Sequence, residues 1–387
     1  MKSKKIITYL FVAIMCLGLV VGCSSEKVED TIKIGGNFEL TGGVAEFGIK
    51  GENGAKLAIK EVNEAGGVLG QQIEYVAADN KSEAGEATIA TNKLVTQDKV
   101  VGILGPMTTG NTLGAIQIVT DNKIPLVTPT ATNTKITINE DGTRNDWVFR
   151  ACFIDPFQGE VAANFALDTL GTSKAALIID QKGDYSKGLA ESFKKTFEAA
   201  GKEVVASEQY VAGQDTDFRA ILTNIKAKNP DVVFIPGYYT EVGMIIKQAR
   251  DLDMNAVFIG GDGWGTGPIV DIAGAEAMNN TYYVDHVAVD DPALAEFAKA
   301  YEAEYGVKSD SFAALGYDAA KLLLNAIEAA GSTDGEAIRS ALENTTDFEG
   351  VSGKFTIDPA THNPKKSASI LQFIDGNKVF KTRVDPK

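Results

Sequence analysis

The chain has 387 residues, with 37 Lys and Arg against 52 Asp and Glu, and a formal net charge of −15. Nucleic acid is excluded as a partner because its phosphates repel so acidic a protein. The chain is also too long for one ordinary hydrophobic core, so we expect two lobes of middling size.

Residues 1–22 have the pattern of a signal peptide. Three lysines open the chain, and an uncharged, mainly apolar run over residues 6–21 follows before Gly22 and Cys23. The run is short for a membrane span of about 20 residues. A small residue before a cysteine resembles the cleavage site of a lipoprotein signal, so we predict cleavage before Cys23 and lipidation of Cys23. The alternative is a retained membrane anchor in which Cys23 has no role.

The predicted mature protein is extracytoplasmic and attached to the membrane by lipid. Residues 23–30 are polar and charged, which is typical of a tether between the lipid and a folded body. Cys152 is then the remaining thiol, so an internal disulfide cannot support the fold and stability must come from the core.

The next 120 residues alternate apolar β-rich runs with amphipathic stretches. Strands are predicted at 32–38, 73–77, 100–104 and 124–127, and helices begin near Phe47, Glu83 and Thr109. This rhythm predicts a parallel sheet that is covered by helices on both faces.

The rhythm begins again after Phe149. An amphipathic run starts at Pro156, strands are predicted at 175–179, 203–207, 232–235 and 256–259, and helices at 185–200, 218–228 and 241–252. The two halves also resemble each other weakly, since an aromatic residue precedes a glycine turn by a similar distance in each (Phe47 to Gly105 and Tyr185 to Gly237). Two α/β lobes of one architecture are therefore favoured over a single large sheet.

The C-terminal part contains both helical and β-like segments. Residues 292–342 are helical in pattern, with one long helix over 310–330, and β-like pieces follow at 353–357, 369–373 and 378–382. These elements can complete both lobes. We predict an N-terminal lobe of residues 31–151 plus 286–346 and a C-terminal lobe of residues 152–285 plus 347–387.

Candidate binding residues follow the strands. In doubly wound sheets, ligands bind beyond the carboxyl ends of the strands, where helix N-termini point free N–H groups. Hydroxyl and backbone groups at 108–109 and 130–132 suit a carboxylate. Helix capping is the better explanation of a lone threonine, whereas two such sites on successive strands of one sheet make binding and capping about equally good explanations. Asp262, between glycines, suits an ammonium group, and the alternative is a turn aspartate. Aromatic walls are predicted from Phe47, Tyr185, Tyr238 and Trp264.

Signals for catalysis are weak. The chain has two histidines, His286 and His362, in different contexts, and neither a G-x-S-x-G motif nor a Walker loop. Cys/His clusters that would indicate a metal are absent from the sequence. We therefore expect no enzyme activity and no cofactor. The rival interpretation is an amidohydrolase that uses Asp262 as its base.

From residue 31 to the C-terminus, the chain resembles the branched-chain amino acid-binding proteins of ABC importers, the Leu/Ile/Val-binding type of periplasmic receptor. The resemblance rests on short segments in a fixed order: 34–35, 40–42, 45–48, 63–70, 103–106, 128–132, 237–238 and 260–263. It implies two Rossmann-like lobes joined by three crossover segments, the type I periplasmic binding protein fold.

The resemblance also implies roles for residues. The ligand's charged ends would be held by Thr108, Thr109, Thr130, Ala131, Thr132, Tyr185, Tyr238 and Asp262, and Phe47 would contact its side chain. Three features depart from the family. Asp262 stands where these receptors usually carry Glu, Ser82 and Thr108 stand where they often have a disulfide, and Trp264 beside the acid is bulky enough to narrow the pocket.

The predicted function is an extracytoplasmic receptor, expected to be monomeric, that closes on a branched-chain or other apolar amino acid and delivers it to an ABC permease. An amide, urea or an aromatic acid is an alternative ligand. A ligand sensor and a structural lipoprotein are alternative functions. The particular ligand, the permease and the kind of cell envelope stay open at this level.

Overall fold

The computed structural model describes residues 31–288 and 290–386, and a folded unit begins at Ile32. The predicted signal peptide, the tether and Cys23 lie outside these residues. Within the described part of the chain, no helix is both long enough and apolar enough to cross a membrane.

The first sheet has five parallel strands in the order β2-β1-β3-β4-β5. Their bounds are β1 Ile32–Phe38, β2 Ile73–Asp79, β3 Gly102–Leu104, β4 Leu126–Thr128 and β5 Val148–Arg150. Neighbouring strand residues pack into different cores, since Leu104 faces the side of α11 (Ser311–Ala330) and Ile103 faces the side of α4 (Thr109–Asn122). Both faces are therefore covered, as the apolar runs predicted.

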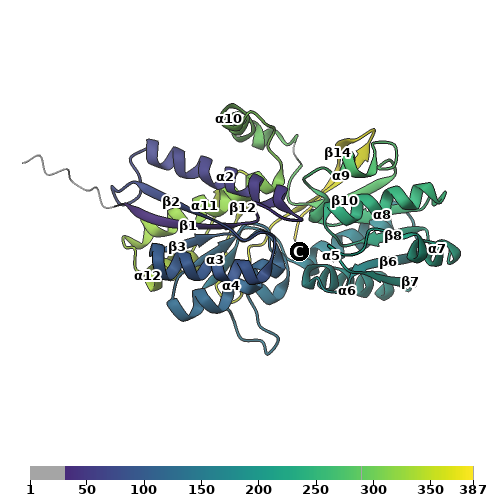
Figure 1. Cartoon of the computed structure of the whole chain (residues 1–387), viewed down its shortest axis with the longest axis horizontal. Coiled ribbons are helices and arrows are strands. Elements are labelled where there is room, and N and C mark those ends of the chain that lie inside the picture. Colours follow the sequence, from purple (N-terminus) through teal and green to yellow (C-terminus); the bar gives the residue numbers. More distant parts are fainter. Residues whose placement is uncertain (1–30, 289, 387) are drawn as a thin grey trace, which may run out of the picture. The chain divides into compact units, whose positions relative to one another are not determined.

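The helices of this lobe come from two distant parts of the chain. α2 (Ala45–Glu64) packs on α11, and α3 (Ala84–Lys93) packs on α4 (Figure 1). α10 (Ala295–Tyr305) and α12 (Gly335–Glu343) complete the group. Close approach of α2 and α11 depends on glycines, because a Cβ at Gly54 or Gly316 would meet the backbone of the opposite helix at 2.0 or 2.1 Å.

The second sheet has seven strands in the order β14-β13-β10-β9-β8-β6-β7. The parallel strands are β6 Lys174–Asp180, β7 Glu203–Tyr210, β8 Val232–Ile235, β9 Val257–Gly260 and β10 Thr281–Asp285. β13 (Ala368–Ile374) and β14 (Asn377–Val384) extend it in antiparallel fashion. The helices of this lobe are α5 Asp155–Asn164, α6 Asp184–Ala199, α7 Arg219–Ala227, α8 Tyr239–Asp251 and α9 Ile269–Ala273.

The predicted fold class is confirmed, because two sheets of mainly parallel strands are each covered by helices. The chain passes between the two groups of elements three times: from β5 to α5, from β10 to α10, and in the segment before β13 (Figure 1). Both sheets direct the carboxyl ends of their parallel strands to loops that open helices.

The segment before the third crossing is tied to the first group of elements. The two-stranded sheet of β11 (Phe348–Gly350) and β12 (Gly353–Phe355) is bonded to α11, where the Asp318 carboxylate accepts the backbone N–H groups of Val351 and Ser352 at 2.8 and 2.9 Å. Residues 347–362, which the sequence assigned to the C-terminal lobe, thus contact the N-terminal one. The lobe boundaries themselves stay a prediction.

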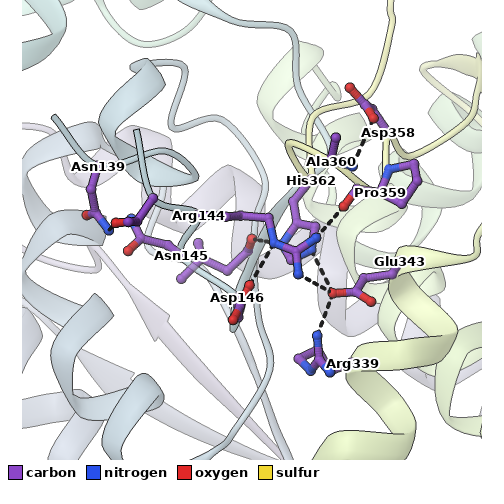
Figure 2. Close-up of polar contacts among 12 residues, drawn as sticks. Asn139, Arg144, Asn145, Asp146, Arg339, Glu343, Asp358, Pro359, Ala360 and His362 are labelled. Atoms are coloured by element: carbon purple, nitrogen blue, oxygen red, sulfur yellow. Dashed lines mark hydrogen bonds and ion pairs between the residues drawn. The ribbon is translucent and has the colours of Figure 1, made fainter. Parts of the chain in front are cut away.

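A cluster of charged residues holds the same segment further along. Figure 2 shows Glu343 of α12, whose Oε1 lies 2.9 Å from Nη2 of Arg144 and 3.1 Å from Nε2 of His362. The His362 ring is buried, stacks on Phe149 and lies with Nδ1 3.0 Å from the Val148 carbonyl oxygen. His362 therefore has a structural environment, next to the end strand of the first sheet.

Candidate functional site

A small cavity of about 10 Å³ lies where loops and helices of the two lobes meet. The first lobe contributes six lining residues, from α2, the β3–α4 loop and the start of α4, the loop after β4, and α11, and the second lobe contributes four. The lining consists of Phe47, Met107, Thr108, Thr109, Thr130, Phe312 and, from the second lobe, Tyr185, Tyr238, Asp262 and Gly263.

The hydroxyl groups on the first lobe are not equivalent. The Thr130 hydroxyl donates to the Met107 carbonyl oxygen at 2.7 Å, and the Thr108 hydroxyl donates to Glu39 at 3.0 Å. Only the Thr109 hydroxyl of these three is buried with no hydrogen-bond partner. Thr109 is the first residue of α4, where the partial positive charge of the helix N-terminus favours an anion. This end of the cavity can therefore accept a carboxylate through Thr109.

Glu39 fixes the shape of that loop, and sequence reasoning missed it. Its fully buried carboxylate accepts the backbone N–H groups of Met107 and Thr108, each at 3.1 Å, and the Asn111 side-chain amide at 2.8 Å. Burial raises the pKa of Glu39, and these donors oppose that rise because they stabilise the charged form. A charged residue directly after an apolar strand is the signal in the sequence that could have drawn attention to it.

Asp262 forms the acidic end of the cavity. Its Oδ1 accepts the Tyr185 hydroxyl at 2.8 Å and the Gln158 side-chain amide at 2.8 Å, and its Oδ2 lies 3.1 Å from Nε2 of His286. Burial first, and then the charge of Asp262, raise the pKa of Tyr185 well above its usual value, so the phenol keeps its proton and donates it. Asp262 is the one ionisable carboxylate in the lining, and no Lys or Arg is among the ten lining residues.

Aromatic side chains cross the junction between the lobes. Phe47 stacks on Phe312 with ring centres 4.4 Å apart and meets the edge of Tyr238 at 5.3 Å. Tyr238 in turn stacks on Tyr185 at 5.2 Å. With Met107, these rings form the apolar part of the cavity lining. Phe312 was missed because it lies on α11, 265 positions beyond Phe47 in the chain.

Seven of the ten residues predicted from the sequence line the cavity: Phe47, Thr108, Thr109, Thr130, Tyr185, Tyr238 and Asp262. The other three do not. Ala131 is fully buried, and its carbonyl oxygen accepts Arg150 at 2.7 Å. Thr132 is fully buried, and its carbonyl oxygen accepts the backbone N–H of Asp155 at 3.0 Å.

Trp264 lies in the core beneath the cavity. The indole is fully buried, packs against Gly260 and donates its N–H to the Ile235 carbonyl oxygen at 3.1 Å. The side chain follows Asp262 in a short 3₁₀ turn, which directs it toward the sheet, while Asp262 faces the cavity. Trp264 is not among the residues that line the cavity, so it does not narrow the pocket as the sequence suggested.

Metal and covalent chemistry find little support in these residues. Among residues 31–288 and 290–386, no group of three or more His, Cys, Asp or Glu is arranged to hold a metal ion. Cys152 is fully buried, and burial raises the pKa of its thiol to about 12. A thiol of that kind is a poor nucleophile at neutral pH.

Comparison with known proteins agrees with this geometry. A model of the periplasmic binding protein family matches residues 31–378. The chain belongs to this family. This periplasmic binding protein is 35% identical to the Leu/Ile/Val-binding protein BraC3 of Rhizobium johnstonii over 89% of its own length and 92% of the relative. It is 31% identical to the leucine-, isoleucine-, valine-, threonine- and alanine-binding protein of Pseudomonas aeruginosa, over 92% and 93% of the two chains.

Solved structures give the same family. The periplasmic binding protein resembles the branched-chain amino acid transporter substrate-binding protein LivJ of Streptococcus pneumoniae, solved in complex with isoleucine, with a TM-score of 0.86. The two are 39% identical, and the match covers 92% of this chain and all of LivJ. The leucine-binding protein LivK of Thermotoga maritima matches with a TM-score of 0.85 and 34% identity over 92% and 99% of the chains. The resemblance read from the sequence segments is therefore confirmed.

Proposed function

We propose that this protein is the extracytoplasmic binding component of an ABC importer and that it encloses one apolar α-amino acid between its lobes. The observation that carries the proposal is the division of one small cavity into three chemical parts. Thr109 at the N-terminus of α4 suits a carboxylate, Asp262 suits an ammonium group, and Phe47, Met107 and Phe312 form an apolar wall. The names of the relatives, which are binding proteins for Leu, Ile and Val, support the same ligand class.

The cavity favours an amino acid over the other ligands considered. An aromatic acid offers no positive group to Asp262, and burying an unpaired carboxylate is costly. Urea and small amides carry no carboxylate for the end at Thr109. The relatives are described as binding proteins, and we expect this chain likewise to bind its ligand without converting it.

Calorimetry with the soluble protein, beginning at Ser24, tests the ligand class. We expect L-leucine, L-isoleucine or L-valine to bind, and benzoate and urea not to bind. Asp262→Asn should weaken binding by about 30-fold or more, because it removes one partner of a buried, hydrogen-bonded charge pair. Thr109→Ala should weaken it by about tenfold.

Two controls accompany these variants. Thr109→Ser keeps the hydroxyl and should retain most of the affinity, whereas Ser192→Ala lies on α6 outside the lining and should leave it unchanged. Binding of benzoate but of no amino acid would refute the proposed ligand class.

The membrane attachment and the quaternary state belong to the same proposal. Lipidation of Cys23 would hold the receptor at the outer face of the membrane that contains the permease. Cys23→Ser should release the protein from the membrane fraction, and the mass of the wild-type N-terminal peptide should include the lipid. Light scattering of the soluble form should give the mass of a monomer. Retention of the Cys23→Ser variant in the membrane would instead support an uncleaved anchor.

A further inference from the structure

The Asp262 carboxylate is held by residues that do not themselves line the cavity. Gln158 on α5 donates from Nε2 to Oδ1 at 2.8 Å, and His286, directly after β10, lies with Nε2 3.1 Å from Oδ2. Both side chains are buried, with 0% and 3% of their residue surface exposed. Neither belongs to the ten lining residues, so any effect they have on a ligand passes through Asp262.

Both contacts have a defined polarity. The Nδ1 of His286 is buried without a hydrogen-bond partner. A bare Nε2 would place its lone pair against a carboxylate oxygen, so the ring must carry its proton on Nε2 and donate it. The orientation of the Gln158 amide follows in the same way. If Oε1 and Nε2 were exchanged, the Oε1 acceptor would face Oδ1 of Asp262, which is also an acceptor. His286 is kept in place by stacking on Phe153 with ring centres 3.8 Å apart.

Counting acceptor positions shows what is left for a ligand. An ionised carboxylate can accept about four hydrogen bonds. Tyr185 and Gln158 occupy two positions on Oδ1, and His286 occupies one on Oδ2. One position remains, on Oδ2, and Asp262 lines the cavity. These three donors thus keep the carboxylate in one orientation and leave one acceptor position of Oδ2 for a ligand.

We infer that Gln158 and His286 are positioning residues, which hold Asp262 so that its last acceptor position receives the ammonium group of the ligand. They thereby determine selectivity for ligands that carry an amino group over the same molecules without one. The inference rests on the proposed function, and it adds two residues that the cavity itself does not reveal.

A double-mutant cycle with two ligands tests the inference. The ligands are L-leucine and 4-methylpentanoate, which is leucine without its amino group. His286→Leu and Gln158→Leu should each weaken leucine binding by at least about fivefold, yet change 4-methylpentanoate binding by less than twofold. When Asp262→Asn is already present, adding His286→Leu should cause no further loss of leucine affinity.

Conservative and matched variants separate positioning from general damage. His286→Gln retains an N–H donor and should recover most of the leucine affinity. His362→Leu is the matched control, because it removes the other buried histidine. His362 contacts Glu343, and neither residue lines the cavity. This variant should leave the leucine dissociation constant unchanged, whatever it does to stability.

The outcomes separate the positioning role from the proposed function. Equal losses for leucine and 4-methylpentanoate, or the same loss from His286→Leu with and without Asp262→Asn, would overturn the positioning role while leaving the proposed function intact. A wild-type protein that binds no amino acid would overturn the proposed function and the positioning role together.

Discussion

Replacing Asp155 by Asn should remove part of the pH dependence of stability. Asp155 is the first residue of α5 and is 1% exposed. Its Oδ2 accepts the Asn133 side-chain amide at 3.0 Å, and its Oδ1 has no hydrogen-bond partner. Burial, together with the charge of nearby Asp262, raises the pKa of Asp155 from an ordinary 3.8 to about 7. The folded protein therefore holds a proton on Asp155 at pH values where the unfolded chain has lost it.

The sign follows from proton linkage. Between about pH 4 and pH 7 the folded state binds more protons at Asp155 than the unfolded state, so this residue lowers the unfolding free energy as the pH rises. Across this whole pH window, Asp155 lowers the unfolding free energy by about 4 kcal/mol, at about 1.4 kcal/mol for each unit by which its pKa is raised. Between pH 5 and pH 8 the same two pKa values give about 2.5 kcal/mol.

Urea unfolding of the ligand-free protein measures this contribution. We expect the unfolding free energy of Asp155→Asn, relative to wild type, to increase by about 2.5 kcal/mol from pH 5 to pH 8, because Asn does not titrate. Asp79→Asn is a control at a carboxylate whose pKa is shifted in the opposite direction. Partial burial opposes the shift, but the hydroxyl and backbone donors around Asp79 hold its pKa below the ordinary 3.8. Asp79 is therefore ionised in both the folded and the unfolded state from pH 5 to pH 8, so the difference between Asp79→Asn and wild type should stay constant over this range. A difference between Asp155→Asn and wild type that stays constant across this range would refute the reasoning.

Three further results are expected. Trp264→Ala should lower the unfolding free energy by about 3–5 kcal/mol, because it leaves a large cavity in the core, while the ligand preference measured by calorimetry stays the same. Glu343→Ala should lower it by about 1–3 kcal/mol in urea unfolding, since Arg144 and buried His362 lose their shared acceptor (Figure 2). Cys152 should resist iodoacetamide in the native protein and react only after unfolding, as mass spectrometry of the soluble form can show. Rapid native labelling would contradict the burial of this thiol.

The local pattern of the chain determined most of the architecture. Runs such as 232–235 are apolar on both faces, and only a strand covered on both sides accommodates them, so β8 was predicted with the bounds it has. The helix predicted over 310–330 is α11, with Asp310 as its N-cap. Three short strands, β5, β10 and β11, were not predicted, because a three- to five-residue run has too little periodicity to stand out from a loop.

The strand ends also located most of the candidate site. Loops after β3, β4, β8 and β9 contribute Thr109, Thr130, Tyr238 and Asp262 to the cavity, as the position of a helix start after each parallel strand implies. This information is local, since a strand followed by a helix places the loop at one edge of the sheet. The lipid anchor, the lobe boundaries and the roles of these residues in binding stay predictions.

Only the tertiary structure decided which side chains meet. Gln158, Asp262 and His286 come from α5, the turn after β9 and the end of β10, and sheet pairing rather than sequence spacing brings them within hydrogen-bonding distance. Trp264 and Asp262 are two residues apart, yet one is in the core and the other in the cavity, because a 3₁₀ turn points them in different directions. Sequence pattern determines where the chain turns, whereas long-range packing determines what each side chain then faces.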